Sequence, residues 1–186
     1  MNFVNSFFYL YLTKLKGAYI LHLVEQSGVL WWIVILRLFS MFYGEYSHGI
    51  DTKGRIILPS RLRDVAKENG VEKFYVTRGL DKCIFMFADS EWRMQENKFK
   101  GLSFTKQQSR NFNRLFFAGA VDVVPDRQGR FIIPDYLKHF AGIKKDAVVI
   151  GVSNRIEIWD TKTWQEFFSR TSADFEQTAE GMLELS

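Results

Sequence analysis

From residue 41 onward, the order of hydrophobic and polar positions is typical of short strands alternating with short amphipathic helices. The pattern predicts a strand over 44–50, a polar turn over 51–54 and a β-rich run over 55–58. Pro59 stops that run, and Ser60 is expected to cap a short helix to about residue 69. Two strands over 73–77 and 83–87 and an amphipathic helix over 90–100 complete this first set of elements.

The same order of elements is predicted a second time. The ranges are strand 119–124, turn 126–129, β-rich run 130–133, helix 135–141, strands 147–151 and 155–159, and helix 161–170. Pro134 stops the second run, and Asp135 takes the place of Ser60 as the expected cap. Residues 105–108 have the form of a capping box, which predicts a connecting helix to about residue 115.

The two sets are copies of one unit. Residues 42–62 read FYGEYSHGIDTKGRIILPSRL and residues 117–137 read FAGAVDVVPDRQGRFIIPDYL, which are identical at eight of 21 positions without a gap. A unit with such short strands does not bury a sufficient core alone, whereas two units packed face to face can. We therefore expect one compact α+β, β-rich domain with approximate internal two-fold symmetry.

The first forty residues differ in composition from the rest. They hold four charges and nine of the thirty aromatic residues, whereas the other 146 residues hold 42 charges. Their longest clean apolar run, 28–36, has nine residues, and spanning a bilayer takes about 20. Three interpretations stay open: a start codon assigned upstream of a true start at Met41, a weak membrane or interfacial segment, or a helix packed on the domain or on a partner chain. The repeat favours the first, because organised sequence begins within a residue or two of Met41.

Composition narrows the class of protein. A hydrophobic content of 47% supports a packed core, and a net charge of +4 permits an anionic partner without requiring one. The single Cys83 excludes a disulfide framework and a CxxC zinc site, and His48 and His139 are not in ligand spacing with it. We expect no metal or other cofactor. The chain lacks the Walker A, GxGxxG, HExxH and GxSxG motifs, so we do not expect an enzyme.

Candidate chemistry lies in the two polar turns. Asp51 and Gly54 are expected to form the first turn, and Asp126 and Gly129 the second, with each glycine relieving a backbone conformation that is awkward for other residues. Basic side chains stand beside both bends. The candidate DNA-binding residues are Lys53, Arg55, Arg127 and Arg130 in the turns, with Arg61 and Arg63 on the following helix.

Two interpretations of these basic residues can coexist. Arg55 and Arg130 can pair bidentately with guanine at a groove edge, whereas Arg61 and Arg63 are expected to contact phosphate or only solvent. Alternatively, Arg55 and Arg130 form ion pairs with the Asp of their own turn and only order the hairpin. Beyond a DNA-binding regulator, an assembly module whose repeats only build an oligomer stays open. An RNA binder is disfavoured because the strands lack stacking aromatics of the RNP type.

The two repeated stretches, together with TRGLD at 77–81 and GVSNRIEIW at 151–159, resemble the MraZ family of bacterial transcriptional regulators. The resemblance covers about residues 41–170. It implies two tandem pseudo-symmetric repeats that form an AbrB-like swapped-hairpin β-barrel with flanking helices. The implied division of the chain is an apolar extension at 1–40, repeat 1 at 45–92, a helical connector at 93–117, repeat 2 at 120–163, and a C-terminal helix and tail at 164–186.

The resemblance also implies a function. Family members are expected to form ring-like homo-oligomers, larger than dimers, that bind G-rich direct repeats in double-stranded DNA. The promoter concerned lies ahead of the division and cell-wall gene cluster, and the regulator's own gene comes first. A cytoplasmic, nucleoid-associated location follows, with no small-molecule substrate and no membrane partner expected.

Overall fold

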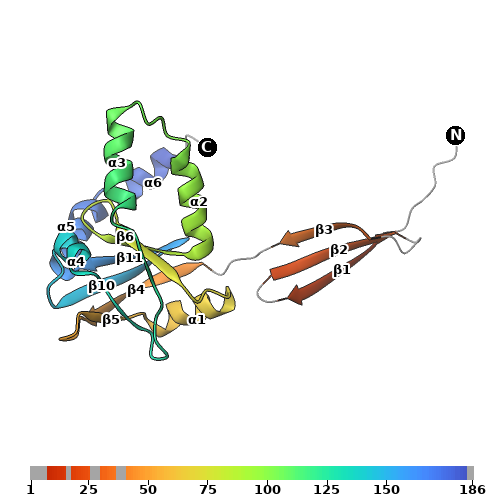
Figure 1. Cartoon of the computed structure of the whole chain (residues 1–186), viewed down its shortest axis with the longest axis horizontal. Helices are drawn as coiled ribbons and strands as arrows, with labels where there is room; N and C mark the ends of the chain where they lie inside the picture. Colours follow the sequence, from red (N-terminus) through yellow and green to blue (C-terminus); the bar gives the residue numbers. More distant parts are fainter. Residues whose placement is uncertain (1–7, 16–17, 26–29, 37–40, 184–186) are drawn as a thin grey trace.

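The computed structural model describes residues 8–15, 18–25, 30–36 and 41–183. Its largest sheet is antiparallel, with six strands in the order β4-β10-β11-β7-β6-β8 (Figure 1). These strands are β4 (Phe42–Gly49), β6 (Phe74–Arg78), β7 (Ile84–Ala88), β8 (Val121–Val123), β10 (Asp146–Ser153) and β11 (Arg155–Asp160). A separate two-stranded ribbon pairs β5 (Arg55–Ile57) with β9 (Arg130–Ile132).

Six helices accompany these strands in the described part of the chain. They are α1 (Ser60–Glu68), α2 (Asp89–Lys100), α3 (Gln107–Phe117), α4 (Asp135–Ala141), α5 (Thr161–Ser172) and α6 (Phe175–Leu183). The predicted caps at Ser60 and Asp135 are wrong, because α1 and α4 already begin at these residues. Pro59 and Pro134 occupy the cap positions instead, without side-chain cap hydrogen bonds. The predicted capping box is wrong as well, since α3 begins after Lys106 without a side-chain cap.

The two repeats exchange strands. β4 of repeat 1 pairs with β10 of repeat 2, and β8, the counterpart of β4, pairs with β6 of repeat 1. In the same way, β6 and β7 of repeat 1 are the counterparts of β10 and β11 of repeat 2. When each strand is replaced by its counterpart, the order of strands is the same from either edge of the sheet. The registers obey the same two-fold symmetry, since Phe85 lies opposite Glu157 at the centre of the sheet and Ile56 opposite Phe131 at the centre of the ribbon. Neither repeat completes its own sheet.

The result is a mixed α+β fold built from two tandem repeats. Among the described strands, backbone pairing runs from β4 to β8 without closing into a ring. The exchanged segments agree with a swapped arrangement of the two repeats. The closed barrel itself stays a prediction.

Apolar residues cover both faces of the six-stranded sheet. On one face, Ile56, Leu62, Ile133 and Leu137 bring the ribbon, its flanking segments, α1 and α4 into the largest hydrophobic core. On the other face, α5 packs on β10 and β11, while α2 and α3 pack on β6 and β7. Trp92 is buried in an aromatic cluster with Phe116, and Figure 1 shows α2 and α3 rising side by side from the sheet. The ribbon and its turns are thereby fixed on a packed base.

Three described strands before Met41 form a separate sheet. β1 (Phe8–Leu15), β2 (Ala18–Glu25) and β3 (Leu30–Leu36) pair in sequence order as antiparallel strands. The helical interpretation of this segment is therefore wrong. The segment is rich in Tyr, Ile, Val and Trp, which favour strands. No helix within the described residues is both long and apolar enough to cross a membrane.

Candidate nucleic-acid interface

The β5–β9 ribbon presents arginine and isoleucine on its outer face. Strand alternation buries Ile56 and Phe131 beneath the ribbon and turns their neighbours outward. Arg55 lies opposite Ile132, and Ile57 lies opposite Arg130, so the two arginines sit diagonally across the ribbon. Ile57 is 42% exposed and Ile132 is 58% exposed. The outer face therefore combines two cations with two apolar side chains in a two-fold arrangement.

The first turn holds Arg55 in a defined position. The Oδ1 atom of Asp51 accepts hydrogen bonds from the backbone N–H groups of Lys53 and Arg55, each 2.9 Å long. The Oδ2 atom accepts from Nε of Arg55 at 2.8 Å, and Nη2 lies 2.7 Å away. Gly54 makes the bend with φ of +74°. The Asp51 carboxylate thus orders the turn and fixes the guanidinium together.

The second turn repeats this geometry. Oδ1 of Asp126 accepts from the backbone of Gln128 at 2.8 Å and of Arg130 at 2.9 Å, and Oδ2 accepts from Nε of Arg130 at 2.8 Å. Gly129 has φ of +81°. In each turn, the backbone amide of the Arg and then its guanidinium hold the pKa of the Asp below its ordinary value. The carboxylates therefore stay charged at neutral pH and continue to orient the arginines.

Each turn is covered by a basic side chain from the other repeat. Arg63 of α1 lies against Gly129, so closely that a Cβ atom at that position would overlap its side chain. Its structural counterpart, Lys138 of α4, places Nζ 2.8 Å from the Cβ position of Gly54. The backbone adds reciprocal hydrogen bonds, from Leu58 to Gly129 at 2.8 Å and from Ile133 to Gly54 at 3.3 Å. The two turns therefore depend on one another across the two-fold axis.

The remaining candidate residues occupy different environments. Lys53 and Arg127 are exposed in the turns, but they are not counterparts, because Gln128 matches Lys53 and Thr52 matches Arg127. Arg61 is exposed on α1. Arg63 is only partly exposed, and its buried Nε lacks a hydrogen-bond partner among the described residues. The structure thus brings Arg55 and Arg130 together on one ribbon and assigns Arg63 a packing contact that the sequence did not predict.

Arg78, a basic residue of β6, is engaged in contacts within the protein. Its Nη1 atom donates to the carbonyl oxygen of Leu115 at 2.9 Å, near the end of α3. Its guanidinium lies over the rings of Tyr136 and Phe140 on α4, 5.6 and 5.9 Å from their centroids. Arg78 therefore ties β6 and the connecting helix to the helix that carries Lys138.

The ribbon has the form of a groove-reading element. The major groove of B-DNA admits a two-stranded ribbon, and guanine offers two acceptors to an arginine there. A guanidinium has five N–H donors, so Arg55, held by Asp51 at Nε and Nη2, keeps its Nη1 end for another acceptor.

Among the described residues, no three His, Cys, Asp or Glu side chains are grouped as metal ligands.

Sequence reasoning missed the exposed isoleucines and the cross-repeat contacts. The alternation within Arg-Ile-Ile and Arg-Phe-Ile could have identified the outward positions of Ile57 and Ile132. The contacts of Arg63 and Lys138 have no local signal, because the turns that they contact lie 66 and 84 residues away in the chain.

A comparison with protein families agrees with the two-fold architecture. A family model described as "MraZ protein, putative antitoxin-like" matches residues 41–115 and, a second time, residues 116–185. The two matches meet within the last turn of α3, close to the place where the chain passes from one structural repeat to the next. Together they cover well over half of the chain, and the protein therefore belongs to the MraZ family.

Proposed function

We propose that this protein is a sequence-specific DNA-binding transcriptional regulator that reads double-stranded DNA with the β5–β9 ribbon. The observation that carries the proposal is the pair of arginines on the ribbon, each fixed by an aspartate. The two strands of the ribbon, and with them the two arginines, are related by two-fold symmetry. A side chain that is already ordered loses less conformational entropy on binding than a free one. Fixed arginines on an outward face therefore suit base recognition better than mobile surface charges do.

The basic residues divide into two roles under this proposal. Arg55 and Arg130 read guanine bases, and the exposed Ile57 and Ile132 give apolar contacts to thymine methyl groups. Lys53, Arg127 and Arg61 contact phosphates, which positions the protein without reading sequence. Arg63 packs against the Gly129 turn, and its partly exposed side chain serves as a further phosphate contact under this proposal.

The operator and the assembly belong to the same proposal. The protein binds G-rich direct repeats ahead of the division and cell-wall gene cluster, including its own promoter, as a ring-like homo-oligomer built from swapped-hairpin barrels. Exposed apolar side chains support self-association; they are Phe104, Leu115, Phe168, Phe175 and Met182. One ribbon contacts a small site, whereas several linked ribbons on repeated sites gain avidity without new contacts.

A binding titration tests the proposed function. The full chain is mixed with a duplex taken from upstream of its own reading frame, and with a scrambled duplex of the same length and composition, at one fixed salt concentration. We expect the upstream duplex to bind roughly a thousandfold more tightly or better, as specific operators do. Equal affinity for both duplexes in a fully assembled sample would contradict the proposal and favour an assembly module without sequence readout.

A further inference from the structure

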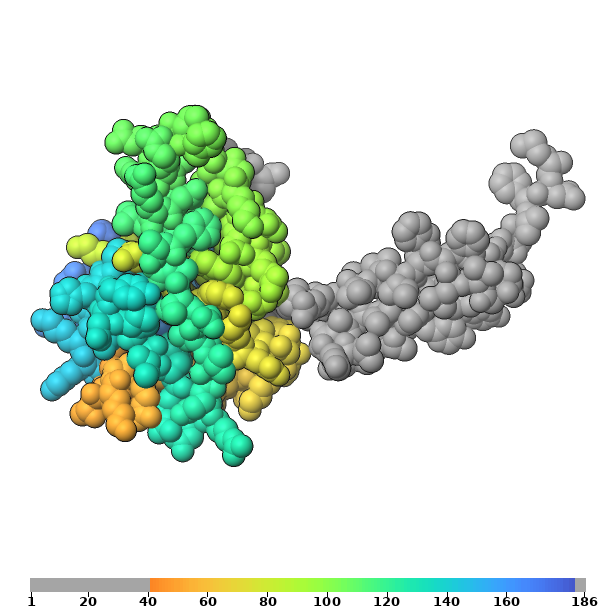
Figure 2. All heavy atoms as spheres, viewed as in Figure 1, coloured from red at the N-terminus to blue at the C-terminus, as the bar shows by residue number. Residues whose placement is uncertain are grey.

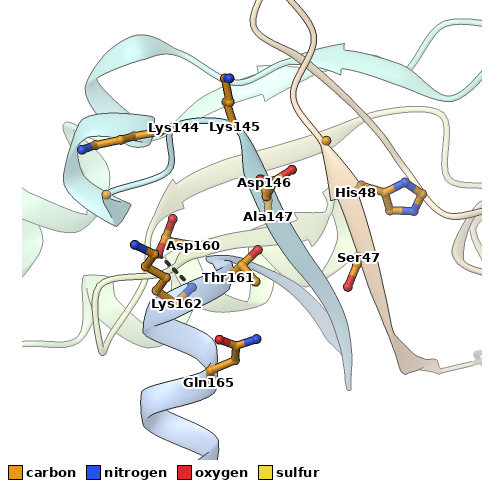
Figure 3. A pocket seen from close by; sticks show the side chains of 12 residues that line it. Ser47, His48, Lys144, Lys145, Asp146, Ala147, Asp160, Thr161, Lys162 and Gln165 are labelled. Atoms are coloured by element: carbon orange, nitrogen blue, oxygen red, sulfur yellow. Dashed lines mark hydrogen bonds between the residues drawn. The ribbon is translucent and has the colours of Figure 1, made fainter.

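An open groove of about 770 Å³ lies beside the turn that runs from Asp51 to Gly54. It is formed where β4 ends, β10 begins and α5 begins. Figure 3 shows three lysines at its rim: Lys144 and Lys145 from the segment before β10, and Lys162 from the first turn of α5. All three are exposed. None of them corresponds to a candidate residue identified from the sequence.

These lysines are not held in direct ion pairs. Within residues 41–182, none of the three forms an ion pair, although Asp146 and Asp160 also line the groove. Asp160 is engaged elsewhere, because its Oδ1 accepts from the backbone N–H groups of Lys162 and Thr163 and so caps α5. That carboxylate occupies the helix end, so an anion would be held by the lysine ammonium groups themselves.

The groove is continuous with the ribbon. The backbone N–H of Ile50, immediately before Asp51, donates to the carbonyl oxygen of Lys145 at 2.6 Å. Figure 2 shows the orange surface of the first residues of repeat 1 adjoining the cyan surface of repeat 2. Lys53 is exposed in the turn that joins β4, which lines the groove, to β5 of the ribbon. A polyanion bound at the ribbon can therefore pass over the groove without leaving the protein surface.

The counterpart groove in repeat 1 has a different charge. By strand register Phe74 corresponds to Ala147, so Glu72 and Lys73 stand at the positions of Lys145 and Asp146. Ser90 stands at the position of Lys162. Its two cations share one carboxylate, since Asp89 lies 3.8 Å from Nζ of Lys73 and 3.1 Å from Nε of Arg93. The ribbon is symmetric, but its two flanks are not.

We propose that the Lys144–Lys145–Lys162 groove binds DNA phosphates beside the segment held by the ribbon, and that it does so on one flank only. This inference rests on the proposed function of the ribbon. A symmetric ribbon alone could lie in either of two directions on a duplex. A one-sided set of phosphate contacts favours one direction and lets successive chains follow direct repeats with the same polarity.

The test compares two triple variants of the full chain. Lys144→Gln/Lys145→Gln/Lys162→Gln removes the groove charges, and Lys98→Gln/Lys100→Gln/Lys106→Gln removes three exposed charges at the far end of the α2–α3 pair. Binding to the upstream and scrambled duplexes is measured over a series of salt concentrations. Each lost phosphate contact lowers the slope of log affinity against log salt by about 0.9. We expect the groove variant to lose two to three units of slope per bound chain, and the control less than one.

Hydroxyl-radical footprinting supplies the second readout. Wild-type protein should protect sugars beyond the ribbon-bound segment on one side only, and the groove variant should lose that flank while keeping its preference for the upstream duplex. An unchanged slope or an unchanged footprint in the groove variant overturns the inference and leaves the proposed function intact. Absence of any preference for the upstream duplex in the wild-type protein overturns both.

Discussion

At the scale of single residues, one carboxylate performs two tasks in each turn. Asp51 and Asp126 accept backbone hydrogen bonds that close the turn, and the second oxygen of each holds the arginine four residues later. From the sequence, each arginine could either order its own turn or contact a base. This one geometry is compatible with both roles. An exposed ion pair alone contributes little stability, so its main effect here is to restrict the arginine.

The lowered pKa values of Asp51 and Asp126 predict a pH-dependent stability. A carboxyl group whose pKa is lower in the folded protein adds stability above its unfolded pKa and loses it as the pH falls through the folded value. We expect Asp51→Asn/Asp126→Asn to melt at a lower temperature than the parent at pH 7. The difference should shrink as the pH falls below about 4, near the ordinary value for Asp.

Asp64 supplies the control for this experiment. It is exposed on α1 and forms no ion pair within residues 41–182. Asp64→Asn should melt like the parent at every pH tested. A melting difference for the double variant that stays constant from pH 7 to pH 3 would show that the two carboxylate charges do not order the turns.

At the scale of elements, each Asp-x-x-Gly-Arg turn is completed by the opposite repeat. The contact of Arg63 with Gly129 and that of Lys138 with Gly54 differ in one respect. An added Cβ at Gly129 meets the middle of the Arg63 side chain, whereas at Gly54 it meets the mobile end of Lys138. Both glycines have positive φ and therefore share the backbone cost of a substitution.

This difference predicts unequal effects of two alanine substitutions. Gly54→Ala should lower the free energy of unfolding by about 1–2 kcal/mol, the cost of a left-handed conformation. Gly129→Ala should cost roughly 1 kcal/mol or more beyond that, because the Arg63 side chain must move. Urea denaturation measures both values.

A double variant isolates the contact. Arg63→Ala should recover the extra loss in the Gly129→Ala background, whereas Lys138→Ala should recover none of it. Equal costs for the two glycine variants, with no coupling to Arg63, would contradict the cross-repeat contact.

Most elements could be predicted from local signals. These signals are the repeated Asp-x-x-Gly-Arg turns, the prolines at 59 and 134 and the apolar runs. The boundaries predicted from them lie within about two residues of the observed ones for most strands and helices. The helix caps failed because a proline can occupy the cap position without offering a side-chain acceptor. An exchange between the repeats was implied only by the family resemblance, and the lysine groove could not be derived at all, since both depend on which distant segments meet.

At the scale of the whole molecule, the repeats from Met41 onward form a unit that is separate in its backbone pairing from β1–β3. The six-stranded sheet contains none of the first three strands, and the family match begins at residue 41. We therefore expect a chain beginning at Met41 to melt at the same temperature as the full chain and to bind the upstream duplex equally well. A large loss of melting temperature on removing residues 1–40 would show that the first sheet supports the second.

Assembly is the second property of the whole molecule. The exposed apolar residues on α3, α5 and α6 and in the loop before α3 offer surface for self-association. The proposed ring-like assembly predicts a homo-oligomer larger than a dimer. Light scattering at micromolar concentration measures its mass, and binding should be much weaker to a duplex with one operator repeat than to one with several. A monomer that still binds tightly would contradict this arrangement.

The central claim is that Arg55 and Arg130 read bases, and one set of binding curves tests it most directly. Arg55→Ala, Arg130→Ala and the control Arg61→Ala are titrated with the upstream and scrambled duplexes, beside a melting curve and a mass measurement for each variant. Each ribbon variant should lose roughly 1–3 kcal/mol of binding free energy on the upstream duplex and much of its preference over the scrambled one. Arg61→Ala should weaken both duplexes alike and lower the salt slope by about one unit. Unchanged affinity for the upstream duplex in folded, fully assembled Arg55→Ala and Arg130→Ala proteins would remove the ribbon from the recognition surface.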